Sequence, residues 1–108
     1  MSPHEAAKKL AESIKASEEY LSFKSAKENV YSIESSKKML DNLQEKMMEL
    51  QMMSMQGDEI SDEQINNIQR QQEVALLDVN IKDYFEKEMK LEQLMNDVSK
   101  IISEVVEI

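Results

Sequence analysis

Four carboxylates crowd one short stretch of the chain, and a carboxylate cluster is the usual starting point for a calcium site. They are Asp58, Glu59, Asp62 and Glu63. Their spacing lacks the Asp-x-Asp-x-Asp-Gly repeat and the distal Glu of an EF-hand loop. Two of them directly follow Ser61, where acidic residues stabilise the positive end of a helix dipole. We therefore interpret the cluster as a helix start and predict no metal site.

The other reactive side chains do not form a catalytic pattern either. His4 is the only histidine, and without a cysteine the chain excludes thiol catalysis, disulfides and thiolate metal ligands. A single glycine, Gly57, cannot supply the glycine-rich motifs of nucleotide-binding or serine hydrolase sites. The remaining acids lie at helix starts or alternate with lysines on solvent faces. We expect a protein that is not an enzyme and takes no cofactor.

The composition predicts an all-α fold. The 108 residues fit one domain spanning 1–108, and one Gly and one Pro leave little to interrupt helices. No apolar run approaches 18 residues and no secretory segment follows Met1, so we expect a cytoplasmic protein that does not enter membranes.

Charge is unevenly distributed along the chain. The net charge of −9 disfavours direct binding to nucleic acid phosphates. Up to Ser54 the chain has eight Lys and nine acidic residues, whereas from Met55 onward it has four Lys and one Arg but thirteen acidic residues. The acidic C-terminal half is a candidate surface for a basic protein partner, although we favour the interpretation that it is the solvated surface that keeps the protein soluble.

Helix-capping signals divide the chain into five helices. Ser2 precedes Pro3 and Glu5 as in a capping box, and Ser17 precedes two acids. The first helix is expected to bury one apolar stripe. A break is expected at 32–33, with Ser32 as the cap of the third helix.

A long antiparallel hairpin is expected in the middle of the chain, with helices at about 34–56 and 62–77. Gly57 suits the position after the first helix of the hairpin, where φ is positive, and Ser61 starts the capping box of the second. Residues at helical spacing predict the packed face between the two helices. This expected hairpin core consists of Leu40, Leu43, Met47, Leu50, Ile65, Ile68 and Leu76.

A second apolar row on the first hairpin helix consists of Met48, Met52 and Met55. It lies roughly 100° to 160° around the helix from the core stripe, so one neighbouring helix cannot cover both. Methionine is common on surfaces that adapt to a partner. Either a second copy of the chain or the first two helices of the same chain would cover this row, and we favour a helical-bundle dimer with these residues at its interface.

The last helix starts at Asp78 or Asn80 and is expected to pack along its whole length. Its apolar residues repeat in a heptad-like pattern, which is typical of a helix packed against other helices. This seam consists of Tyr84, Leu91, Leu94, Val98, Ile101 and Val105.

Four segments follow one another in a recognisable order, namely 17–20 (Ser-Glu-Glu-Tyr), 35–40 (Ser-Ser-Lys-Lys-Met-Leu), 55–63 and the last helix with Glu88, Leu91 and Leu94. Their order and spacing resemble the YlbF/YmcA/YheA family of small bacterial helical proteins. The resemblance implies a helical dimer without catalytic activity. Some relatives act in a complex that affects RNA turnover, competence, sporulation and biofilm formation, with iron–sulfur clusters held through C-terminal cysteines. This chain has no cysteine, which places it nearer the YheA-like branch and puts a cluster role in doubt.

Two functional hypotheses follow from the sequence. The first is a homodimeric adaptor or regulator that binds another protein through the acidic half or the hairpin tip. The second is a holdase-like helical chaperone that captures unfolded clients on exposed methionines. The acidic tip from Gly57 to Glu63 favours the adaptor, because chaperone tips of this kind are apolar.

Overall fold

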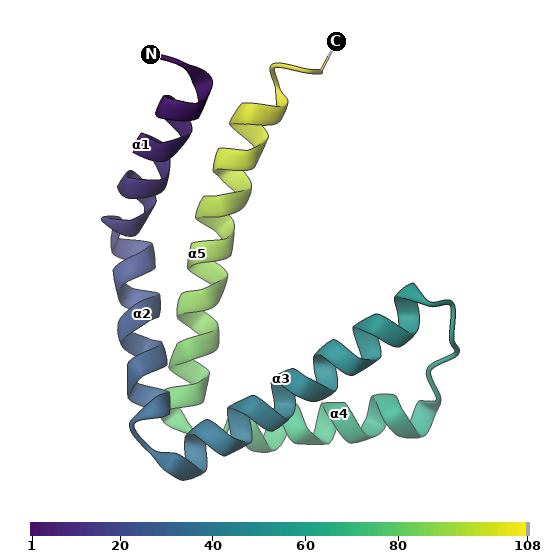
Figure 1. Cartoon of the computed structure of the whole chain (residues 1–108). Helices are drawn as coiled ribbons and strands as arrows, with labels where there is room; N and C mark the ends of the chain where they lie inside the picture. The colour runs from purple at the N-terminus through teal and green to yellow at the C-terminus, as the bar shows by residue number, and fades with distance from the viewer. Residues whose placement is uncertain (108) are drawn as a thin grey trace.

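The computed structural model describes residues 1–107 and confirms an all-α fold of five helices (Figure 1). The helices follow one another with short connections, the longest of which is the turn between the third and the fourth. Their bounds are Pro3–Lys15 for α1, Glu18–Tyr31 for α2, Glu34–Met55 for α3, Asp62–Ala75 for α4 and Val79–Ser103 for α5.

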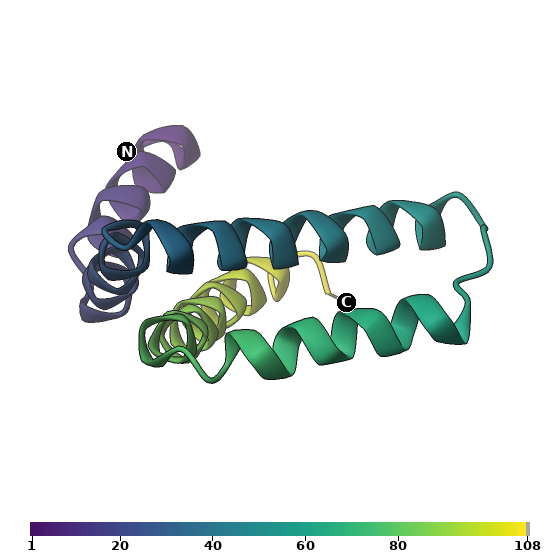
Figure 2. The same ribbon diagram turned by 90° about the horizontal axis from the view of Figure 1, so that it is seen from below.

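The helices form two arms that meet at an elbow. One arm consists of α1 and α2 in line with each other, with α5 running alongside, and the other is the α3–α4 hairpin (Figure 1). Seen from below, α3 and α4 lie side by side and α5 rises behind them (Figure 2). Both termini lie at the free end of the first arm, and the hairpin turn lies at the free end of the second.

The helix starts follow the capping signals in the sequence. The hydroxyls of Ser2, Ser17 and Ser61 each accept a hydrogen bond from a backbone N–H three residues later. At α4 the Gln64 side chain reciprocates, which completes the capping box. Asp78, one of the two residues expected to cap α5, does so by accepting from two backbone N–H groups.

The cap of α3 differs from the expectation. Ile33 occupies the N-cap position and its side chain makes no cap hydrogen bond. Ser32 instead ends α2, where its hydroxyl donates to the Asn29 carbonyl. The expected cap was wrong because a serine next to a break satisfies the end of one helix as readily as the start of the next.

Gly57 ends the first helix of the hairpin with a φ of +81°, as its sequence position predicted. A Cβ at this position would meet no atom within 4 Å, so any cost of a side chain comes from the backbone conformation. We expect Gly57→Ala to lower the free energy of unfolding by about 1 kcal/mol. Urea unfolding followed by circular dichroism measures the change, and Gln56→Ala, next to it in the αR conformation, is the control expected to cost less.

The buried core lies at the elbow. Apart from Ser36, the fully buried residues are hydrophobic, and α2, α3, α4 and α5 all contribute. Leu40 and Leu43 anchor α3 there, and the rings of Phe23 and Tyr84 lie 5.1 Å apart across α2 and α5. The buried hydrophobic residues are Ala26, Val30, Leu40, Leu43, Ala75, Ile81 and Tyr84.

The hairpin is packed less completely than its sequence pattern suggests. Leu50 and Ile68 are half-buried, but Met47, Ile65 and Leu76 are exposed. These last three were therefore misassigned to the core of the single chain. Met47 and Ile65 lie in the part of the hairpin away from the elbow, where α3 and α4 have only each other to pack against (Figure 1), and Leu76 follows the end of α4.

The free end of the first arm also differs from the expectation. In α5, Leu91, Leu94 and Val98 are half-buried, whereas Ile101 and Val105 are 67% and 84% exposed. The seam therefore stays packed only as far as Val98, because α2 no longer runs beside the helix there. None of α1's residues is buried, so the stripe expected on α1 is at most half-covered.

The molecule is extended and thin. Its radius of gyration is 17.5 Å, against about 13 Å for a compact chain of this length. Its dimensions are 51 × 37 × 16 Å, and the shortest of them is only the thickness of two layers of helices. The accessible surface is 8542 Å², whereas a compact monomer of 12.5 kDa exposes about 6,200 Å².

Candidate interaction surface

The second methionine row of α3 is exposed in the single chain. Met48, Met52 and Met55 are 63%, 54% and 80% exposed. Neither α1 nor α2 covers the row, so the intramolecular alternative does not describe this structure. Three adjacent apolar side chains on one helix face form a candidate surface for protein contact.

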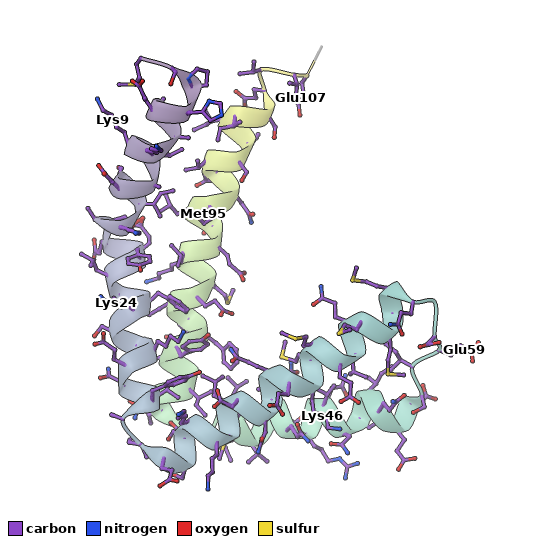
Figure 3. The ribbon with its side chains drawn as sticks, in the orientation of Figure 1. Lys9, Lys24, Lys46, Glu59, Met95 and Glu107 are labelled. Carbon is purple, nitrogen blue, oxygen red and sulfur yellow. The ribbon has the colours of Figure 1, made fainter. Side chains whose placement is uncertain are left out.

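The methionine row faces the opening between the two arms. Gln44 of α3 donates from Nε2 to the hydroxyl of Tyr84 in α5 over 3.0 Å, which orients that face of α3 toward the first arm. Met48 and Met55 follow Gln44 by four and eleven residues and share its face. Figure 3 shows sulfur atoms along the edge of α3 that borders the opening.

A polar cluster at the elbow continues this surface onto α2. The Tyr31 hydroxyl donates to Asp41 Oδ1 over 2.9 Å, close to the bond between Gln44 and Tyr84. The hydrogen bond to Asp41 raises the pKa of Tyr31 above its ordinary value. Burial raises the pKa of Tyr84, although the bond from Gln44 acts in the opposite direction. Both phenols therefore stay neutral donors or acceptors at physiological pH.

Two lysines lie over the ring of Tyr31. The ammonium groups of Lys27 and Lys37 lie 5.6 Å and 5.4 Å from the centre of its ring, within cation–π range. Next to the ring, an open hollow of about 340 Å³ is lined by α2. Its lining residues are Tyr20, Phe23, Lys24, Lys27, Glu28 and Tyr31. This basic and aromatic face stands out in a chain with a net charge of −9.

The opposite flank of the hairpin is polar. A shallow hollow of about 430 Å³ there is lined by three amides, by the chain's one arginine, Arg70, and by the apolar side chains of Met39 and Val74. The Gln71 amide donates to Asn67 Oδ1 over 3.1 Å, which joins two of these side chains. A neighbouring hollow is lined by polar side chains alone. The hairpin thus has an apolar flank toward the first arm and a polar flank away from it.

The residues that the structure describes contain neither a metal-binding cluster nor a membrane-spanning helix. Across residues 1–107, acidic and histidine side chains do not converge in any group of three that could hold a metal ion. The helices lack a stretch that is both long and apolar enough to span a bilayer. Sequence reasoning missed the cluster of Tyr31, Asp41, Gln44 and Tyr84, because its hydrogen bonds join residues 10 and 40 positions apart and no local pattern marks them.

A family model described as "Control of competence regulator ComK, YlbF/YmcA" matches residues 4–107. The chain belongs to this family. Among its relatives, a UPF0342 protein of Symbiobacterium thermophilum is 36% identical over 99 residues, covering 92% of this chain and 88% of the relative. A UPF0342 protein of Staphylococcus aureus is 34% identical over 96 residues, covering 89% and 84%.

A solved structure supports the fold of this YlbF/YmcA family member. It is a "Protein of Unknown Function (DUF964) from Bacillus stearothermophilus", which superposes with a TM-score of 0.88 at 23% sequence identity. The match covers 95% of this chain and 90% of the other. The two-armed arrangement is therefore shared with a second protein of low sequence identity. The family resemblance noted from the sequence is confirmed.

Proposed function

We propose that this protein is a non-catalytic, homodimeric regulatory adaptor of the cytoplasm that binds another protein. The observation that carries the proposal is the exposed methionine row on α3, which faces the opening between the arms. Membership of a family described by control of the competence regulator ComK supports a regulatory role.

The surface area of the single chain supports dimerisation. The chain exposes about 2,300 Å² more than a compact monomer of its mass. A standard protein–protein interface buries about 1,200–2,000 Å² in total, or about 800 Å² from each partner. The excess on one chain is thus enough to supply its half of a dimer interface and to leave further surface for another partner.

The acidic C-terminal half supports binding of a basic partner. From Met55 onward the chain has thirteen acidic residues and five basic ones, and α4 and α5 carry most of the acidic residues. Electrostatic attraction of this kind speeds association and disfavours acidic competitors. Binding to such a partner is expected to weaken with rising salt.

Sedimentation equilibrium of the wild-type protein tests the central claim. We expect a mass of twice 12.5 kDa at micromolar concentration. A mass of 12.5 kDa up to concentrations of about 100 μM would contradict a functional homodimer. The holdase alternative makes a separate prediction, which is suppression of aggregation of an unrelated unfolding protein at equimolar amounts.

A further inference from the structure

We infer that the opening between the two arms receives the hairpin tip of a second copy, with two α3 helices packed antiparallel. In this arrangement the acidic tip of each copy lies against the lysines around Tyr31 of the other. The inference rests on the proposed homodimer and specifies its register and recognition chemistry.

One continuous stripe on α3 connects the lysine cluster with the methionine row. Its residues recur at intervals of three or four, so they lie on one helix face. The Tyr31–Asp41 and Gln44–Tyr84 hydrogen bonds fix the direction of that face toward the first arm. From the elbow to the tip, the stripe consists of Lys37, Asp41, Gln44, Met48, Met52 and Met55.

The position of the methionines within the stripe sets the register of an antiparallel pair. Met48 and Met55 are equidistant from a point beside Met52, so a twofold axis there pairs each Met48 with the partner's Met55. With a helical rise of 1.5 Å per residue, Asp58 lies about 10 Å from that axis, measured along α3. The same distance along the partner's α3 reaches Glu45 of the partner subunit. The turn lies beyond the end of α3 (Figure 1), so it carries the tip further toward the partner's Asp41 and the partner's Tyr31.

Charge favours this register. The tip carries Asp58 and Glu59, which have no salt bridge to a lysine or arginine of the described chain. The elbow cluster presents Lys24, Lys27 and Lys37. Two carboxylates also belong to it, namely Glu28 and Asp41, and Asp41 is already bonded to Tyr31. Around the Tyr31 ring the three lysines outnumber these two acids, so an incoming acidic tip meets net positive charge there. Glu45 on α3 and Glu88 beside Tyr84 carry negative charge nearer the methionine row.

A reciprocal charge exchange tests the inference. One variant combines Lys27→Glu with Lys37→Glu, and the other combines Asp58→Lys with Glu59→Lys. In each homodimer, like charges would meet at both ends of the interface, and we expect the dimer dissociation constant to rise about tenfold or more. In a heterodimer of the two variants, every tip meets a cluster of opposite charge. Mixing them is therefore expected to restore dimers of near wild-type affinity.

Mass photometry or native mass spectrometry of the mixture, with one variant carrying a mass tag, counts the three dimer species. Predominance of the heterodimer supports the register. If the two variants form homodimers as tightly as the wild type and mix statistically, the register is wrong while the homodimer stands. If the wild type itself is monomeric, the proposed function fails first. Circular dichroism melting of each variant separates loss of pairing from loss of folding.

Discussion

The double variant Met48→Glu with Met52→Glu is expected to be a monomer where the wild type is a dimer. Both side chains are exposed in the single chain, and glutamate is as good a helix former as methionine, so the fold of α3 is preserved. In the dimer, four carboxylates would be removed from water without partners, at a cost of several kcal/mol. Sedimentation equilibrium is expected to show a dimer dissociation constant raised at least about a hundredfold.

A matched control places equal charge on the opposite flank of the same helix. Asn42→Glu with Lys46→Gln also lowers the net charge of the chain by two, and both positions lie on the polar side of the hairpin. This variant is expected to remain dimeric. Equal dissociation of both variants would mean that net repulsion, and not the methionine row, controls the association. An unchanged dimer in the methionine variant would remove this row from the interface.

The fold could be predicted from local signals because helix ends are specified by neighbouring residues. Ser61 and Gln64 satisfy each other's backbone groups within one turn, and Gly57 adopts its positive φ whatever lies around it. These features predict where helices start and stop. They do not predict the angle between the two arms, since the connections at Ser32 and Leu77 allow many directions.

The candidate surface could be predicted only in part for the same reason. Periodicity identified the second methionine row, because residue spacing alone decides which side chains share a helix face. It also placed Met47 in the core, where the structure leaves it exposed. Spacing cannot say how wide a face the neighbouring helix covers. The Gln44–Tyr84 hydrogen bond joins residues 40 positions apart, and no local pattern marks such a pair.

Asp78→Ala is expected to lower the free energy of unfolding by about 2–3 kcal/mol. Asp78 Oδ1 accepts from the backbone N–H groups of Asn80 and Ile81 at the start of α5, which accounts for about 1 kcal/mol. Its Oδ2 accepts from the hydroxyl of Ser36, which is only 3% exposed. Removing the carboxylate leaves that buried hydroxyl without its acceptor, which costs about 1–3 kcal/mol. Urea unfolding at one fixed protein concentration measures the total.

The partner residue provides the control for this effect. Ser36→Ala removes the hydroxyl but leaves the cap of α5 intact, so its cost is expected to be smaller than that of Asp78→Ala. The double variant Ser36→Ala with Asp78→Ala is expected to be less destabilised than the sum of the single changes, because no hydroxyl is left unpaired. Additive effects of the two changes would show that the hydrogen bond between the two side chains does not contribute to stability.

Acid should weaken the same contact. The hydrogen bond from Ser36 lowers the pKa of Asp78 below its ordinary value of 3.8, and the backbone N–H groups act in the same direction against the opposing effect of burial. Since the folded pKa lies below the unfolded one, the unfolded chain takes up the proton more readily. The contribution of Asp78 to stability is therefore complete above about pH 4 and is lost as the pH falls through the folded pKa. Asp78→Asn retains a capping oxygen without the charge, so its stability is expected to fall less steeply between pH 5 and pH 2. Parallel slopes for the two proteins would assign the acid sensitivity to other carboxylates.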